Sequence, residues 1–203
     1  NWPPAYREVR YYPTGDNDLT TRAPTPDERK RSYRFDPANP VATFGGANLT
    51  FERGPEDQRK VGQRQDYLRF STPPLDRDVA IAGPVKVELW AATDGPDTDF
   101  VAKLVDVYPD GYEALVLDAP IRTRYRNGRL PEQVRMMTPG APEKLEIDLW
   151  PTALTFEKGH RIALHITSSN SPRFEVNPNT GEPPGQAKAK PRVATNTIYM
   201  DET

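Results

Sequence analysis

The sequence predicts an all-β protein, a two-sheet sandwich of the jelly-roll kind with a long irregular N-terminal segment. In several short segments apolar and polar residues alternate, which is the period of a half-buried strand. The 203 residues include 23 prolines, which disfavour helix interiors and central strands and therefore indicate many turns. No window repeats its apolar residues with the period of a long helix.

The first 60 residues are predicted to be irregular, because residues 20–40 are polar and interrupted by prolines. One edge strand is compatible with residues 6–13 (YREVRYYP). Gly45 and Gly46 follow in the stretch TFGGANLTF, where they permit backbone angles that other residues avoid.

Strands are expected to dominate from about Gln65 onward, because short alternating segments are separated by turn residues. A hairpin is expected around Pro109-Asp110-Gly111, which are good turn formers. The alternating segments are 85–91 (VKVELWA), 100–108 (FVAKLVDVY), 112–125 (YEALVLDAPIRTRY), 143–150 (EKLEIDLW), 160–167 (HRIALHIT) and 195–200 (TNTIYM).

Composition and charge limit the classes of partner. A net charge of −2 provides no basic field for a phosphate backbone, so nucleic acid is not an expected partner. No apolar stretch approaches the roughly 20 residues that span a bilayer, so no membrane is expected either. The absence of cysteine excludes disulfides, a thiolate nucleophile and a cysteine-based zinc site. It leaves the compartment open, cytoplasmic or exported.

A serine hydrolase site needs a serine, a histidine and a carboxylate in contact. The string G-x-S-x-G, which marks one common form of the nucleophile turn, does not occur. The two histidines, His160 and His165, fall on opposite faces of one expected strand and so cannot act together. We interpret His160 as a group that satisfies a strand end, and we expect His165 to be exposed. No catalytic residue is therefore assigned to this chain.

Three aspartates, Asp94, Asp97 and Asp99, lie just before the expected strand 100–108. In a strand the Cα atoms of Asp97 and Asp99 would be about 7 Å apart, which permits an acid/base pair. Loop aspartates can also hold calcium, although the EF-hand order is absent. The commoner role is to hydrogen-bond backbone groups in turns. We favour loop closure, expect no metal or other cofactor, and keep the ion site and the acid/base pair as alternatives.

Three tryptophans raise the alternative of a free-standing carbohydrate-binding module, because sugars stack on aromatic faces. Trp90 lies inside an expected strand and Trp150 ends one, so packing in a core or an interface is the default for both. Trp2 lies in the irregular terminus. Aromatic residues make up only 9% of the chain, so this alternative ranks second.

Four blocks of sequence resemble, in the same order, the C-terminal domain shared by X-prolyl dipeptidyl-peptidases, cocaine-esterase-like acylases and α-amino acid ester hydrolases. The resemblance covers about Phe35 to Gly181. It implies a galactose-binding-like jelly roll that is itself non-catalytic and that follows an α/β-hydrolase domain with a serine triad. The blocks are 35–46 (FDPANPVATFGG), 57–111 (from DQRKVGQRQDYLRF to VDVYPDG), 121–128 (IRTRYRNG) and 147–181 (from IDLWPTALTF to NPNTG).

The resemblance also implies a domain plan and a role. Residues 1–34 would be an extension or linker from the hydrolase domain, and residues 35–203 would be the sandwich, without one last strand that family members usually carry. The chain would be a piece of a longer hydrolase of the ester, amide or X-Pro dipeptidyl-peptidase type. It would stabilise the hydrolase domain and help to wall its substrate pocket, and it would be inactive alone. The hydrolase domain is the expected partner, with a homo-oligomer left open.

Residues are assigned to this role from the same resemblance. The loop after the double glycine would reach the mouth of the hydrolase pocket, so the candidates for the pocket wall are Gly45, Gly46, Leu49 and Phe51. Because strands such as 85–91 carry bulky groups on both faces, we also expect an exposed apolar patch with Trp90 as its largest member. The candidates for interdomain contact are Trp90, Asp99, Phe100, Arg173 and Phe174.

Overall fold

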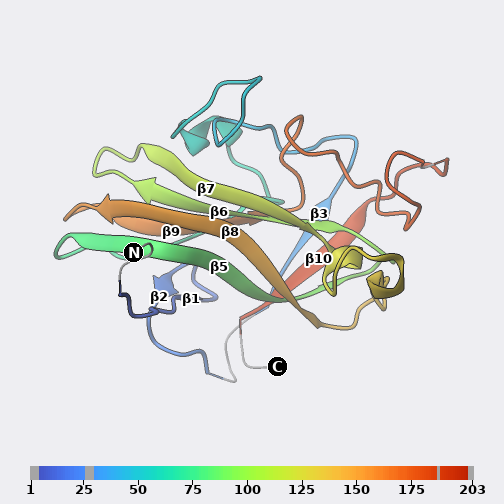
Figure 1. Ribbon diagram of the computed structural model, residues 1–203, viewed down its shortest axis with the longest axis horizontal. Coiled ribbons are helices and arrows are strands. Elements are labelled where there is room, and N and C mark those ends of the chain that lie inside the picture. The colour runs from blue at the N-terminus through green and yellow to red at the C-terminus, as the bar shows by residue number, and fades with distance from the viewer. Residues whose placement is uncertain (1–4, 26–29, 187, 201–203) are drawn as a thin grey trace.

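Two antiparallel four-stranded sheets form the body of the computed structural model, which describes residues 5–25, 30–186 and 188–200 (Figure 1). The first sheet has the order β3-β10-β5-β8 and the second the order β4-β9-β6-β7. The strands of the first sheet are β3 (Arg31–Phe35), β10 (Ala194–Tyr199), β5 (Val79–Thr93) and β8 (Glu143–Phe156). The strands of the second are β4 (Leu68–Ser71), β9 (Arg161–Thr167), β6 (Asp99–Val107) and β7 (Glu113–Arg122). The all-β sandwich prediction is confirmed.

The core lies between the two sheets and follows the period-two pattern of the sequence. In β8 the alternating residues Leu145, Ile147 and Leu149 are buried, whereas the residues between them are exposed. Large aromatic side chains fill the space between the sheets, and these are Phe35, Phe70, Phe100 and Phe156. Three 3₁₀ turns, η1 (Gln58–Val61), η2 (Thr123–Tyr125) and η3 (Pro131–Gln133), connect the strands.

The hairpin expected around Pro109–Gly111 joins β6 to β7. The backbone N–H of Tyr108 donates to the carbonyl of Tyr112, 2.9 Å away, and Asp110 accepts from the N–H of Tyr112. Gly111 adopts φ 84°, which glycine reaches without strain. The turn composition therefore predicted this connection correctly.

The strand expected to end at Trp150 continues to Phe156, which corrects that boundary. Here β8 pairs with β5 across an irregularity between Pro84 and Lys86. Trp150 takes φ 75° and leaves its side chain 70% exposed, while the carboxylate of Asp148 accepts from its backbone N–H. A β-bulge allows a strand to bend and continue. The break in apolar alternation after Trp150 therefore did not mark the end of β8.

The described residues before Gln58 are largely irregular, as expected, with one correction. The segment 6–13 contributes only Tyr12–Pro13 (β1), which pairs with Leu19–Thr20 (β2). In contrast, Arg31–Phe35 forms the regular strand β3, paired along its length with β10. The local sequence of β3 is polar, and the long-range pairing with residues more than 150 positions away supplies its order.

The outer face of the first sheet is charged where the apolar patch around Trp90 was expected. Lys86 and Lys144 form cross-strand ion pairs with Glu146 and Glu88 on this face. Trp90 is half-buried, and its cross-strand partner on β8 is Lys144. The expectation of an apolar face centred on Trp90 is therefore corrected.

Within the described residues, no helix is both long and apolar enough to cross a bilayer.

Candidate functional site

The loop from Gly45 to Gly54, which we call the apolar loop, projects two large apolar side chains into solvent. Leu49 at its tip is 91% exposed and Phe51 is 44% exposed. The loop closes on itself, because Gly46 and Gly54 exchange backbone hydrogen bonds of 2.8 and 3.1 Å. Two large apolar side chains exposed on one short loop form a surface that a partner would cover favourably.

Asn48 fixes the interior of the apolar loop. Its side-chain amide donates to the carbonyls of Gly45 and Glu52, both at 3.0 Å, and its Oδ1 accepts from the N–H of Phe51 at 2.8 Å. These bonds replace the regular ladder that a loop lacks. The backbone that carries Leu49 and Phe51 is therefore held by hydrogen bonds within the loop.

Gly45 and Gly46 adopt φ 70° and 89°, a region that residues with a Cβ rarely enter. A Cβ on Gly45 would collide with the carbonyl of Gly54 and the backbone of Glu56. A Cβ on Gly46 would collide with the guanidinium of Arg173. Both glycines therefore permit a close approach that shapes the apolar loop.

We expect Gly45→Ala to lower the free energy of unfolding by about 2–3 kcal/mol, because it adds a backbone collision to an unfavourable φ. The matched control is Gly185→Ala, since Gly185 has φ 69° but nothing within 4 Å of a Cβ. The control should cost about 1 kcal/mol. Urea unfolding of both variants measures the difference, and equal losses would show that the close approach does not matter.

The apolar loop belongs to a segment that covers the outer face of the second sheet (Figure 1, above β7). Asp57 forms a bridge with Ala114 of β7, and the N–H of Leu115 donates to the carbonyl of Glu56 at 3.3 Å. Gln58 reaches further, to Lys103 in the middle of β6. The segment from Phe44 to Val61 therefore turns an outer sheet face into a second, partly polar interior.

Both histidines lie in hydrogen bonds that do not involve a serine, within the described residues. His165 points to the outer face of the second sheet, as expected, but is buried there rather than exposed, and its Nδ1 lies 3.0 Å from the Tyr67 hydroxyl. Burial holds the pKa of His165 well below its usual value. His160 directly precedes β9, and its Nδ1 lies 2.9 Å from the carboxylate of Asp106 in β6. Ser168 instead bonds the hydroxyl of Tyr33.

The three aspartates each have a different arginine partner. Asp97 is fully buried and lies 2.8 Å from Arg124. Asp99 lies 2.9 Å from Arg122, and the more exposed Asp94 lies 3.1 Å from Arg192. Burial raises the pKa of Asp99, and the bond from Arg122 opposes that rise.

The ion pairs leave little room for an ion site or an acid/base pair at these aspartates. Asp97 also accepts from Thr123, from the N–H of Arg124 and from Asn177, so its oxygens are occupied by donors within the chain. Over the ranges that the structure covers, no group of three or more acidic or histidine side chains is placed to hold a metal ion. The arrangement matches loop closure better than an acid/base pair open to a substrate.

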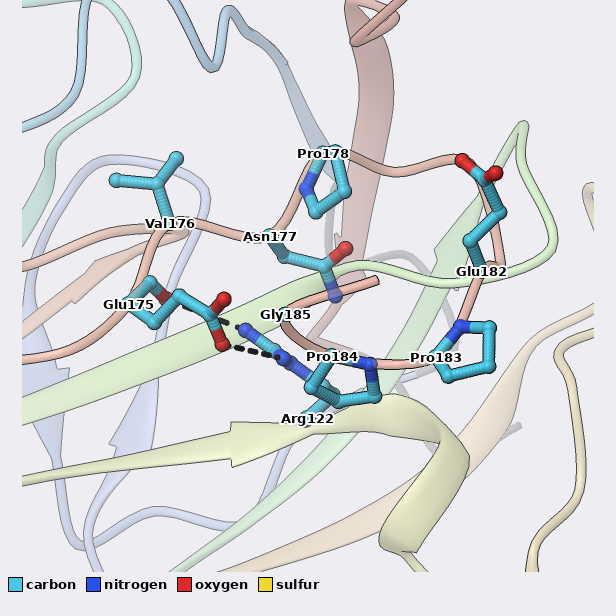
Figure 2. A pocket seen from close by; sticks show the side chains of 9 residues that line it. All are labelled: Arg122, Glu175, Val176, Asn177, Pro178, Glu182, Pro183, Pro184 and Gly185. Atoms are coloured by element: carbon cyan, nitrogen blue, oxygen red, sulfur yellow. Dashed lines mark hydrogen bonds and ion pairs between the residues drawn. The ribbon is translucent and has the colours of Figure 1, made fainter. Parts of the chain in front are cut away.

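A pocket of about 270 Å³ lies beside these ion pairs (Figure 2). Arg122 and Glu175 are joined at its side, and Pro183 and Pro184 close another side (Figure 2). The guanidinium of Arg122 already donates to Asp99, to Glu175 and to the carbonyl of Glu175. The pocket therefore offers no uncompensated charge from Arg122 to a ligand.

The interdomain candidates occupy different environments. Phe100 is fully buried between the sheets and Asp99 is buried in its ion pair, so both side chains pack within this chain, which corrects their assignment to a contact with another domain. Arg173 pairs with Asp118 and lies 4.9 Å from the ring of Phe174, both partly buried beside the apolar loop. Of the five candidates, only Arg173 and Phe174 lie next to the apolar loop.

The tryptophans do not form one aromatic platform. Trp150 lies six residues along β8 from Lys144, the partner of Trp90, so about 20 Å separates the two tryptophans along the strands. Trp2 lies outside the described residues. A sugar-stacking surface built from Trp90 and Trp150 together is therefore not supported.

Sequence reasoning missed the polar residues beneath the apolar loop, chiefly Lys103, Gln58 and Tyr67. Lys103 and Gln58 are fully buried and joined by a hydrogen bond of 2.9 Å. The one signal available was a lysine inside the apolar run FVAKLVDV, which alternation assigns to an outer face. Alternation alone did not indicate that this face is covered.

Comparisons with known proteins agree with this architecture. The chain matches the model of the X-Pro dipeptidyl-peptidase C-terminal non-catalytic domain over residues 1–203. It is 38% identical over 170 residues to a cocaine esterase of Rhodococcus sp. (strain MB1 Bresler), covering 83% of this chain and 29% of that protein.

Two solved structures share the fold. An α-amino acid ester hydrolase superposes with a TM-score of 0.84 and 31% identity, over 94% of this chain and 34% of that chain. An aminopeptidase from a marine sediment archaeon, Thaumarchaeota archaeon, gives 0.85 and 30%, over 99% and 36%. The chain thus spans about a third of the length of the proteins that it matches.

Proposed function

The chain belongs to the family of X-Pro dipeptidyl-peptidase C-terminal non-catalytic domains, and from this premise we propose that it stabilises the α/β-hydrolase domain of a longer serine hydrolase and helps to wall that domain's substrate pocket. The parent reaction would be hydrolysis of an ester, an amide or an X-Pro peptide through a serine acyl-enzyme. The serine, histidine and carboxylate would belong to the hydrolase domain.

The observation that carries the proposal is the apolar loop. Its ordered backbone carries Leu49 and Phe51 in solvent, although burying each side chain would be favourable by about 1.5–3 kcal/mol. Because the loop is already ordered by Asn48, a partner that covers it loses little conformational entropy. A hydrolase domain of the same parent chain is a partner always present at high effective concentration.

A wall of this kind would act on specificity more than on the chemical step. Apolar side chains at a pocket mouth select acyl groups by shape, and they limit the entry of bulk water into the pocket. Arg173 and Phe174 lie beside the loop and would extend the same contact.

We expect Leu49→Ala and Phe51→Ala, made in the full-length hydrolase, to lower kcat/KM for bulky acyl substrates about tenfold or more each, mostly through KM. The smallest acyl group should be least affected, because it does not reach the wall. The measurement is a series of p-nitrophenyl esters from acetate to benzoate, together with an X-Pro p-nitroanilide.

The matched control is Leu130→Ala, since Leu130 is 57% exposed outside the loop. It should leave the substrate series unchanged. Thermal unfolding of the double variant Leu49→Ala/Phe51→Ala should begin at a lower temperature than that of the parent if the loop also stabilises the hydrolase domain. Unchanged kcat/KM across the series in both loop variants would refute the pocket-wall role.

A further inference from the structure

Lys103 is a buried cation with a neutral acceptor. It lies in the middle of β6, is fully buried, and donates from Nζ to Oε1 of Gln58 at 2.9 Å. The ring of Tyr67 lies 5.4 Å from the same Nζ, which adds a cation–π contact. Such a charge is expensive to bury, so its presence here points to a role that an apolar residue would not fill.

Charged and titratable groups from every neighbouring element surround this amine. Asp118 of β7 faces it across one strand pair and His165 of β9 across the other. Arg69 of β4 and Arg173 beside the apolar loop contribute further positive charge. Asp118 is itself engaged by Arg173 and Asn170, so the hydrogen bond that Lys103 makes in the described structure runs to Gln58.

Gln58 connects this cation to both ends of the apolar loop. Its Nε2 donates to the carbonyl of Phe44, just before the loop, and to the carbonyl of Glu56, just after it, each at 2.9 Å. One side chain therefore spans the base of the loop, and Lys103 fixes the orientation of its amide. The amide carbonyl faces the amine and the amide nitrogen faces the loop.

We propose that Lys103 and Gln58 are positioning residues that hold the apolar loop in the orientation that presents Leu49 and Phe51. Neither residue would touch a substrate. That the held loop shapes a substrate pocket rests on the proposed function above, whereas the holding itself does not. A purely structural role in the sheet fits less well, because Gln58 donates to the residues that flank the loop and not to the strands.

The variant Gln58→Glu separates the acceptor bond that Gln58 makes with Lys103 from its two donor bonds at the base of the loop. Gln58→Glu keeps an acceptor for Lys103 but removes both donors to the carbonyls of Phe44 and Glu56. Hydrogen exchange of the 203-residue chain should then show the amides of Gly46 and Gly54 exchanging about tenfold faster or more, with the amides of β6 unchanged. The matched control is Gln186→Glu, the same change at an exposed site, which should leave the loop amides unchanged.

A second variant is tested in case Gln58→Glu unfolds the whole chain. Lys103→Met removes the buried charge, and its control is Lys86→Met at a half-exposed site. Faster exchange confined to the apolar loop in Lys103→Met supports the proposal. Loop exchange that stays at the parent rate in the folded variants overturns it.

Activity of the full-length hydrolase distinguishes this proposal from the proposed function. Gln58→Glu should change the preference among p-nitrophenyl esters in the same direction as Leu49→Ala and Phe51→Ala, through KM more than kcat. If the two loop variants change that preference and Gln58→Glu does not, the positioning role is overturned alone. If neither loop variant changes it, the pocket wall is overturned, and hydrogen exchange still decides whether the loop is held.

Discussion

Replacing Asp97 by Asn should lower the free energy of unfolding of the chain by about 3–5 kcal/mol, because it leaves a buried arginine without its counter-charge. Asp97 is fully buried, and the side chain of Arg124, 2.8 Å away, is 5% exposed. The asparagine would keep the shape of the carboxylate but would place an amide against donors from Arg124 and Asn177. Urea unfolding followed by tryptophan fluorescence measures the loss.

The control for this prediction is Asp94→Asn. Asp94 pairs with Arg192 at 3.1 Å, but both side chains are more than a third exposed, so water screens the pair. Its loss should cost no more than about 1 kcal/mol. Equal losses of stability in the two variants would show that burial does not decide the strength of these ion pairs.

Raising the pH from 8 to 10 should stabilise the chain by about 2 kcal/mol through Lys103 alone. Burial lowers the pKa of Lys103 from 10.5 to about 8 in the folded state. Between these two values the unfolded chain binds a proton that the folded chain has released, so folding becomes more favourable as the pH rises. Below pH 8 both states are protonated and this gain is absent.

The measurement is the free energy of unfolding from pH 7 to 10 for the parent and for Lys103→Met. Tyr33 and Tyr67 oppose the trend near pH 10, because burial raises their pKa and so favours the unfolded state there. Subtracting the Lys103→Met curve removes their contribution. A difference curve that is flat from pH 8 to 10 would contradict the assignment of a buried, charged lysine at this site.

These two networks stabilise different parts of the molecule. The Asp97 network ties the turn before β6 to η2 and to Asn177, beside the pocket of Figure 2. The Lys103 network ties the apolar loop to the second sheet. We therefore expect Asp97→Asn to act on global stability, and Gln58→Glu to act first on the loop.

Much of the fold could be read from the sequence, because strand period and turn chemistry are local properties. The alternation in 143–150 identified the buried residues of β8, and Pro109–Gly111 identified the hairpin. His160 and His165 were predicted on opposite faces of one strand, and their side chains bond Asp106 and the Tyr67 hydroxyl, respectively. Strand β3 was missed because its order comes from pairing with β10, far along the chain.

The sequence by itself determined which face of each strand a residue occupies, since side chains alternate along an extended backbone. Only the tertiary structure decided whether that face meets water. On the outer face of the second sheet, Gln58 of the segment Phe44–Val61 lies against Lys103 and Tyr67 lies against His165. Both side chains are therefore buried, although their positions in the pattern matched exposed residues. In the same way Arg124, which neutralises Asp97, lies 27 residues away, and only the paired strands bring the two charges together.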